Sequence, residues 1–226
     1  MAAKKIVLTG CTRGLGRALL EEWILDGHHL AGCGRNEKTV RELGNRFGAP
    51  HRFDVVDVSE AETVNRWASE VLREGLPDLL VNNAAVMHEP APFWEIPREA
   101  IAQNFQVNLL GSIHVLQAFL PAFVQARRGM IVNLSSGAGR SGIPRISVYG
   151  STKWAIEGLT KSIAAELPEG VGIIPLSPGM VDTDMLRACY GDQAAEHRPV
   201  QAWAKVAARF ILGLTPAQSG QSISTP

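Results

Sequence analysis

The stretch Ser136-Gly-Ala-Gly-Arg-Ser-Gly-Ile-Pro-Arg-Ile-Ser-Val-Tyr-Gly-Ser-Thr-Lys153 places Tyr149 four residues before Lys153. Apolar residues at helical spacing predict a helix over residues 150–167, and side chains at i and i+4 lie on one helix face. A cation beside a phenol lowers its pKa from about 10, so Tyr149 is predicted to act as an acid or base near neutral pH. Ser136 is predicted to end a strand and to donate a hydrogen bond to a substrate oxygen.

The same spacing also occurs in solvated Tyr–Lys pairs, so the surrounding elements decide the interpretation. Short β-rich runs at residues 5–9, 29–33, 53–56, 78–82, 130–135 and 171–176 are predicted strands. Helical patterns at 15–26, 36–47, 59–74, 98–127 and 150–167 alternate with them, the third beginning at a Ser59 cap. Such alternation predicts an α/β fold with one doubly wound parallel sheet and helices on both faces. Residues 1–226 are expected to form a single domain, with a substrate lid at about 180–199.

Composition narrows the classes of partner. The 226-residue chain is 46% hydrophobic and carries 22 basic and 22 acidic side chains. Zero formal charge and the lack of a basic block predict no nucleic-acid or membrane partner. We find no signal-peptide pattern and expect no apolar stretch to reach the ~20 residues of a membrane span. Cys11, Cys33 and Cys189 indicate neither a disulfide framework nor a zinc site, so a cytoplasmic protein without a metal is expected.

A glycine-rich turn, Thr9-Gly-Cys-Thr-Arg-Gly-Leu-Gly16, follows the first predicted strand. Glycines there permit a tight turn and let backbone N–H groups approach a pyrophosphate at the next helix N-terminus. The spacing is Gly-x-x-x-Gly-x-Gly, and such a turn alone is often only a loop. Its place between the opening strand and a helix favours a dinucleotide site. The predicted contacts are Thr9, Gly10, Thr12, Arg13, Gly14, Leu15 and Gly16.

The end of the second predicted strand bears on the choice of cofactor. An acidic residue there would bind the adenosine ribose of NAD, but the chain reads Arg35-Asn36. The guanidinium of Arg35 is a planar fork suited to a phosphate, and Arg13 lies in the glycine turn. Either arginine alone could be a solvated surface residue, but the pair favours NADP(H) over NAD(H). Asp57-Val58, after the third strand, is predicted to meet the adenine.

These pieces, in this order, resemble the short-chain dehydrogenase/reductase family over essentially the whole chain. The resemblance rests on the glycine turn, Asn82-Asn-Ala84, Asn108, Ser136, Tyr149, Lys153 and Pro178-Gly179 with Thr183. It implies a Rossmann fold and an NADP-dependent oxidoreductase acting on alcohol or carbonyl groups of a small molecule. It also implies a homodimer or homotetramer built on the helices at 108–127 and 150–167.

The resemblance implies a role for each of four catalytic residues. Tyr149 would exchange a proton with the substrate, and Lys153 would lower the tyrosine pKa and hold the nicotinamide ribose. Ser136 would steady the carbonyl oxygen, and Asn108 would hold a water linking Lys153 to solvent. The remaining implied cofactor contacts are Asn83, Ala84, Ala85, Pro178, Gly179, Val181 and Thr183.

Two departures from the family pattern concern the site and the C-terminus. Ala85 stands where the family usually has glycine, so its methyl group could crowd the cofactor. The chain after a predicted strand at 221–224 is short, which puts tail-mediated subunit contacts in doubt. The runs at 135–142 and 151–159 resemble plant pterin aldehyde reductases of this family. These are mostly scaffold positions, so they indicate kinship more than substrate identity.

The segments after the last three long strands are predicted to bound the substrate. Their apolar and aromatic candidates are Met87, Phe93, Met180, Met185, Leu186 and Tyr190. These could form a wall for a planar carbonyl compound or simply pack a lid against the core. The leading hypothesis is an NADPH-dependent carbonyl reductase with Tyr149 as proton donor. The alternatives are an NAD-dependent alcohol dehydrogenase and a catalytically silent NADP(H)-binding sensor, although sensors typically lose the tyrosine or lysine that this chain keeps.

Overall fold

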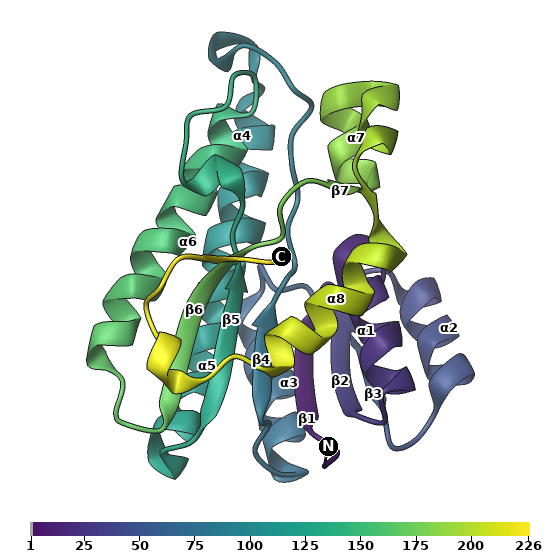
Figure 1. Ribbon diagram of the computed structural model, residues 1–226, viewed down its shortest axis with the longest axis vertical. Helices are drawn as coiled ribbons and strands as arrows, with labels where there is room; N and C mark the ends of the chain where they lie inside the picture. The colour runs from purple at the N-terminus through teal and green to yellow at the C-terminus, as the bar shows by residue number, and fades with distance from the viewer. Residues whose placement is uncertain (1) are drawn as a thin grey trace.

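A computed structural model describes residues 2–226 and contains a seven-stranded sheet (Figure 1). The strands are β1 Lys5–Thr9, β2 His29–Gly34, β3 Arg52–Val55, β4 Leu79–Asn82, β5 Gly129–Leu134, β6 Val171–Ser177 and β9 Ile223–Ser224. They lie in the order β3-β2-β1-β4-β5-β6-β9, and every pair is parallel. The predicted doubly wound parallel sheet is therefore confirmed.

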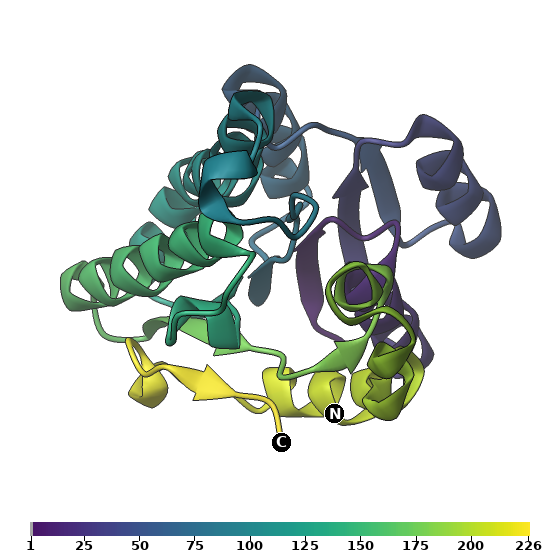
Figure 2. The same ribbon diagram turned by 90° about the horizontal axis from the view of Figure 1, so that it is seen from above.

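Helices cover both faces of the sheet (Figures 1 and 2). One layer contains α1 Gly14–Leu25, α2 Glu37–Phe47 and α8 Val200–Leu212, and the other α3 Ala61–Arg73, α5 Gly111–Ala126 and α6 Ser147–Glu166. Successive residues of a strand pack against opposite helical layers. In β1, Ile6 and Leu8 pack on the α1–α8 side, whereas Val7 packs on the α3–α5 side. Because both faces are covered, the strands are near-continuous apolar runs.

The predicted elements differ from the observed ones mainly at their ends. Ser59 does not cap α3 as expected, because its hydroxyl and amide both donate to Asp57 Oδ1, at 2.7 and 3.0 Å, and α3 begins at Ala61. The Ser59 side chain therefore forms a local turn with Asp57 instead of capping the helix as the pattern predicted. Helix α6 begins at Ser147, three residues before its predicted start, so Tyr149 lies in its first turn.

The predicted long helix at 98–127 consists of α4 Arg98–Asn104, a π-helical segment Phe105–Leu110 and α5. Its best 18-residue window has a mean hydropathy of 1.6 and is 44% buried. By length and composition this helix could cross a membrane, so the expectation that no apolar stretch is long enough is wrong. Core helices of water-soluble proteins pass the same test, and Val115, Phe119 and Phe123 are buried against the sheet.

Short elements cross the carboxyl edge of the sheet. The two-stranded pair β7 Val181–Asp182 and β8 Arg198–Pro199 frames α7 Asp184–Tyr190, which Gly191 ends. Figure 1 shows α7 standing above this edge, apart from the helical layers. The predicted lid segment at 180–199 therefore coincides with one structural unit. Ligands of open parallel sheets bind at this edge, where the strand order reverses beside β1.

Candidate active site

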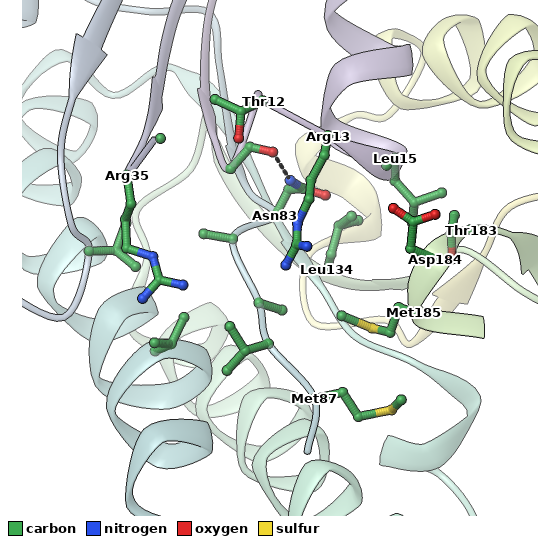
Figure 3. A pocket seen from close by; sticks show the side chains of 18 of the residues that line it. Thr12, Arg13, Leu15, Arg35, Asn83, Met87, Leu134, Thr183, Asp184 and Met185 are labelled. Atoms are coloured by element: carbon green, nitrogen blue, oxygen red, sulfur yellow. Dashed lines mark hydrogen bonds between the residues drawn. The ribbon is translucent and has the colours of Figure 1, made fainter. Parts of the chain in front are cut away.

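A cleft of about 630 Å³ opens at the carboxyl edge of the sheet (Figure 3). It is lined by the glycine turn after β1 and by the ends of β2, β4 and β5. The rest of the lining comes from α2, the segment after β3, the π-helical segment, Pro178 after β6, and helices α6 and α7. Its size is that of an ordinary small-molecule or cofactor site. Because parallel strands end at one edge, segments far apart in the sequence meet here.

The glycine turn makes close contacts that leave no space for a side chain at Gly10 or Gly16. Gly10 has φ +67°, a backbone conformation that favours glycine. A Cβ on Gly16 would lie 2.3 Å from the Gly10 carbonyl oxygen and 2.4 Å from Asn83 Nδ2. Within residues 2–226 no side chain caps α1, which begins at Gly14, so its first backbone N–H groups stay free for an anion.

Thr9 and Asn83 lie beneath the cleft and join the ends of β1 and β4. The buried Thr9 hydroxyl oxygen accepts hydrogen bonds from the backbone N–H groups of Asn83, at 3.0 Å, and Ala84, at 3.1 Å. The Asn83 amide donates to the carbonyl oxygens of Thr9, at 2.8 Å, and Gly10, at 2.9 Å. Thr9 and Gly16 therefore support the turn, whereas Gly10, Asn83 and Ala84 line the cleft.

Two cationic side chains lie at the end of the cleft beside β2. Figure 3 shows the guanidinium groups of Arg13 and Arg35 directed toward the same part of the cavity. Arg35 Nη1 lies 3.6 Å from Asp57 Oδ2, and the Arg35 side chain is 47% exposed. Asn36 accepts from the backbone N–H of Thr39 and caps α2. This end of the cleft can hold a dianionic phosphate, because Arg35 keeps donors that face solvent.

The other end of the cleft contains Tyr149 and Lys153, which the structure brings together on one face of α6. Their side chains are almost completely buried, with residue exposures of 8% and 4%. Lys153 Nζ donates to the carbonyl oxygen of Leu134 at 2.7 Å and lies 5.6 Å from the centre of the Tyr149 ring. The hydroxyl oxygen of Ser136 accepts from the backbone N–H of Ala138 at 3.2 Å, which leaves its own proton free to be donated.

Burial, rather than the lysine charge, dominates the ionisation of this pair. It raises the pKa of Tyr149 to about 12, with the Ser136 hydroxyl acting in the opposite direction. It also lowers the pKa of Lys153 to about 8. The expectation of a phenol made acidic by the neighbouring ammonium is therefore wrong for this structure. Burying the phenolate away from water costs more free energy here than its attraction to the Lys153 ammonium recovers.

Asn108 lies in the π-helical segment, a type of distortion that is frequent at functional sites. Its amide oxygen accepts from the Val86 N–H, and its amide nitrogen donates to the Val86 carbonyl oxygen, both at 2.8 Å. A longer bond of 3.2 Å reaches the Thr152 hydroxyl. Asn108 thus anchors the segment after β4 to α6 below the Tyr149–Lys153 pair.

A small apolar cluster surrounds Tyr149. Met87, Ile143, Met185 and Cys189 pack against Ala138, Ile146 and Tyr149. Cys189 Sγ lies 3.5 Å from Met87 Sδ, so α7 contacts the segment after β4. Sulfur atoms and branched carbons therefore surround the phenol on the side away from the arginines.

Of the six predicted substrate-pocket residues, Met87 and Met185 line the cleft. In the described part of the chain, the other four lie outside its lining. Phe93, Met180 and Tyr190 are 62%, 46% and 41% exposed, and the Leu186 N–H donates to the hydroxyl of Thr183 that caps α7. Their apolar character predicted a wall, but η1 Phe93–Glu95, the link from β6 to β7 and α7 place them outside the lining.

The cofactor predictions also need adjustment. Among residues 2–226, the lining includes Thr12, Arg13, Leu15, Ala85, Val58, Pro178 and Thr183, but not Asp57, Gly179 or Val181. Val181 is buried in the core instead. Sequence reasoning missed further lining residues at strand ends and in neighbouring elements: Cys33, Gly34, Thr39, Val56, Val86, Val107, Leu134, Ser135, Asp184 and Ala188. Their position beside predicted strand ends is the signal that could have found most of them.

No group of three His, Cys, Asp or Glu side chains that could hold a metal ion occurs among the residues that the structure describes.

Comparisons with known proteins agree with this geometry. A family model described as short chain dehydrogenase matches residues 4–194. The NADPH-dependent pterin aldehyde reductase of Arabidopsis thaliana is 35% identical over 99% of this chain and 94% of its own. The sorbitol dehydrogenase of Cereibacter sphaeroides is 35% identical over 79% of this chain and 71% of its own. The solved structure of ElxO with NADP bound superposes with a TM-score of 0.88 at 25% identity, covering 99% and 97% of the two chains.

Proposed function

The chain belongs to the short-chain dehydrogenase family and is an oxidoreductase, and from this premise we propose that it is an NADPH-dependent carbonyl reductase. The observation that carries the proposal is the buried Tyr149 phenol, held beside Ser136 and Lys153 in a cleft whose far end holds two arginines. The reductase and ElxO named above, with NADPH or NADP in their own descriptions, support the cofactor.

The residues present fit NADP(H). Gly10 and Gly14 line the cleft beside the uncapped start of α1, where a pyrophosphate would bind, and a Cβ on Gly14 would meet no protein atom within 4 Å. Arg13 and Arg35 would hold the 2′-phosphate, and Lys153 would hold the nicotinamide ribose. The bound nucleotide would supply the hydride. This chain's own part is to bind and orient both reactants and to move the proton.

The ionisation of Tyr149 is consistent with its role as proton donor in carbonyl reduction. With a pKa of about 12 the phenol keeps its proton at pH 7, and it can give that proton to a carbonyl oxygen. The Ser136 hydroxyl would donate a hydrogen bond to the same oxygen and steady it. Lys153, with a pKa of about 8, is largely an ammonium at pH 7 and would stabilise the phenolate that remains.

The substrate that the site favours is a planar, uncharged aromatic or heteroaromatic aldehyde or ketone. The cluster of Met87, Met185, Cys189 and Ile143 beside Tyr149 supports this class, since thioethers make favourable contacts with aromatic rings. A pterin aldehyde belongs to this class, and the Arabidopsis relative is named for one.

The decisive experiment follows loss of NADPH absorbance with a panel of aldehydes and ketones that includes pterin aldehydes. We expect Tyr149→Phe to abolish turnover while the Kd for NADPH stays within about twofold of wild type, because the variant removes only the proton donor. Tyr190→Phe is the matched control, since Tyr190 is 41% exposed on α7 and lies outside the lining. Near-normal turnover by Tyr149→Phe would exclude this mechanism.

A second candidate is an NAD-dependent alcohol dehydrogenase, which the sorbitol dehydrogenase relative supports. The two candidates differ in the nucleotide that they bind. If the proposal is correct, NADPH binds more tightly than NADH, and Arg35→Ala reduces the difference without weakening NADH binding, with Arg13 left to contact the phosphate. Equal affinity of the wild type for both nucleotides would favour the alternative.

We further propose that the chain forms a homodimer through α5 and α6. An apolar groove of about 520 Å³ on these helices is lined by Ile113, Leu116, Gln117, Leu120, Pro121, Val124, Leu159 and Ile163. The same helices are the ones that pair in the family. Covering this groove would account for the high hydropathy of the half-buried helix.

A further inference from the structure

The turn that follows Ser136 and the helix that carries Lys153 meet at a tightly packed seam. A Cβ on Gly139 would lie 2.8 Å from the Lys153 carbonyl oxygen and 2.9 Å from Ser135 Oγ. The backbone of the turn Gly137–Gly139 therefore rests directly on the backbone of α6. The relative position of Ser136 and Lys153 depends on how firmly this seam is held.

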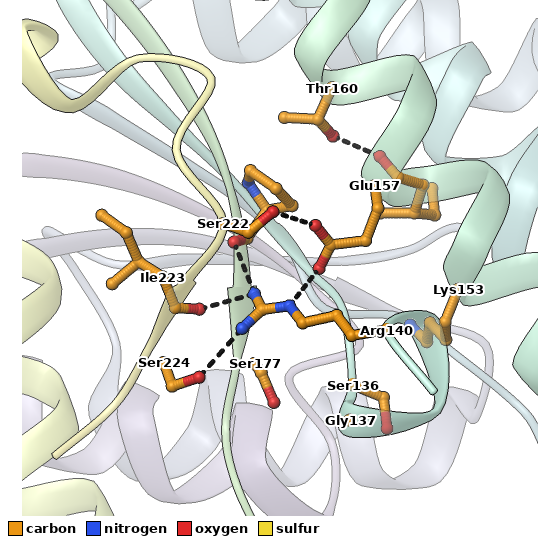
Figure 4. A network of polar contacts seen from close by, with 12 residues as sticks. Ser136, Gly137, Arg140, Lys153, Glu157, Thr160, Ser177, Ser222, Ile223 and Ser224 are labelled. Atoms are coloured by element: carbon orange, nitrogen blue, oxygen red, sulfur yellow. Dashed lines mark hydrogen bonds and ion pairs between the residues drawn. The ribbon is translucent and has the colours of Figure 1, made fainter. Parts of the chain in front are cut away.

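Arg140, the next residue after that turn, uses its guanidinium group to tie three segments together (Figure 4). Its Nε donates to Glu157 Oε1 on α6 at 2.8 Å. Its Nη1 donates to Ser224 Oγ at 2.9 Å, and its Nη2 to the carbonyl oxygen of Ile223 at 2.8 Å. A weaker contact of 3.3 Å reaches the Pro175 carbonyl oxygen of β6. The fixed fork of the guanidinium makes such multiple contacts directional.

Glu157 completes the connection from the helix side. It follows Lys153 by one helical turn, so the two residues lie on one face of α6, and its side chain is 5% exposed. Its second oxygen accepts from the Ser222 hydroxyl. A carboxylate buried to this degree requires its partners, because leaving it unpaired would be costly.

These contacts add to the backbone pairing that holds the C-terminal strand. Strand β9 contains two residues and pairs with β6 through Leu176↔Ile223 and Ser177↔Ser224, and the Thr225 N–H donates to the Ser177 carbonyl oxygen at 2.9 Å. Beyond it, the Thr225 hydroxyl donates to the Pro178 carbonyl oxygen at 2.9 Å, at the wall of the cleft. The strand therefore runs from the Arg140–Glu157 pair to Pro178, which lines the cleft after β6.

We infer that Arg140 and Glu157 are positioning residues that clamp the Ser136 turn, the Lys153 helix and the C-terminal strand into the geometry needed for catalysis. The inference rests on the proposed reductase function and deepens it, because neither residue lines the cleft within the described chain. The clamp acts by fixing where the hydroxyl of Ser136 lies relative to Tyr149 and Lys153. A displacement of about 1 Å at such groups is enough to lower a rate by orders of magnitude.

The test compares Arg140→Met with the double variant Arg140→Met/Glu157→Leu, each assayed well below its own Tm. Arg140→Met is expected to lower kcat by about tenfold or more, with the Kd for NADPH within about twofold of wild type. The double variant also removes the Glu157 carboxylate, which Arg140→Met deprives of its buried guanidinium partner, so its Tm should recover while its kcat stays low. Arg128→Met is the control, since Arg128 forms an exposed ion pair with Asp78 at the amino ends of β5 and β4, away from the cleft.

If Arg140 and Glu157 only stabilise the fold, the result is different. The kcat would then fall and recover together with Tm, and the double variant would regain its activity. That outcome, or a kcat of Arg140→Met within twofold of wild type, would overturn the inference. Hydrogen exchange gives a readout without turnover. In Arg140→Met the amides of residues 136–142 and 222–225 should exchange faster, whereas those of residues 9–16 should not change. Unchanged exchange at both 136–142 and 222–225 would also overturn the inference. Failure of the wild type to reduce any carbonyl would instead contradict the proposed function.

Discussion

Replacing Thr9 with valine tests how the end of β1 supports the cofactor turn. Valine has nearly the shape of threonine but lacks the hydroxyl oxygen that accepts from the N–H groups of Asn83 and Ala84. Each buried N–H donor left without an acceptor costs about 1–3 kcal/mol, and Thr9→Val leaves two of them. Water entering from the cleft can partly satisfy both, so we expect the free energy of unfolding to fall by about 2–4 kcal/mol. For a chain of this size each kcal/mol lowers Tm by about 2–4 °C, which predicts a fall of about 5–15 °C.

The assay is thermal unfolding together with NADPH titration. Because Asn83 and Ala84 line the cleft, the Kd for NADPH should rise in Thr9→Val along with the fall in Tm. Thr9→Ser keeps the acceptor oxygen and loses one methyl group, so it should cost only about 1 kcal/mol. A Tm for Thr9→Val within about 2 °C of wild type, or an equal fall in Thr9→Ser, would refute the reasoning.

Three further predictions concern the site, the turn and the groove. Lys153→Met should be inactive yet more stable than wild type at pH 7, by an amount on the order of a few kcal/mol, because burial lowers the pKa of Lys153 to about 8 in the folded chain, below its ordinary value of 10.5 in the unfolded chain. This advantage should shrink as the pH rises from about 8 toward 10.5, and denaturant unfolding that shows a pH-independent difference would contradict the burial argument. Gly16→Ala should lower stability by about 1–3 kcal/mol and weaken NADPH binding, measured by unfolding and titration, since its Cβ would meet the Gly10 carbonyl; normal NADPH affinity would contradict this. Val124→Glu should convert a dimer to a monomer in light scattering with little change in Tm, because Val124 is 38% exposed at the groove; an unchanged mass would exclude this face as the interface.

Much of the fold followed from local patterns. The alternation of short apolar runs with longer helical segments predicted the parallel sheet, and strand ends agreed to within a few residues. The glycine turn and the Tyr149–Lys153 spacing were equally readable, because turn geometry and helix periodicity involve neighbouring residues. Parallel strands end at one edge of the sheet, and these motifs therefore meet at one site.

Other features depended on contacts between distant segments. Ser59 matched the pattern of a helix cap, but its hydroxyl donates to the Asp57 carboxylate instead. The apolar residues of α7 and of the segment after β4 predicted a substrate wall. In the structure, only Met87 and Met185 of the six predicted pocket residues line the cleft. The Arg140–Glu157 clamp joins residues to a strand more than sixty positions away, and no local pattern indicated it.

The sequence by itself determined which groups could do chemistry and the order in which strands and helices place them at the sheet edge. Only the tertiary structure decided how those groups ionise. The helix spacing predicted a phenol acidified by lysine, whereas burial raises the pKa of Tyr149 to about 12 and lowers that of Lys153 to about 8. Spacing along a helix is a local property, but desolvation is the sum over every segment that excludes water from a side chain.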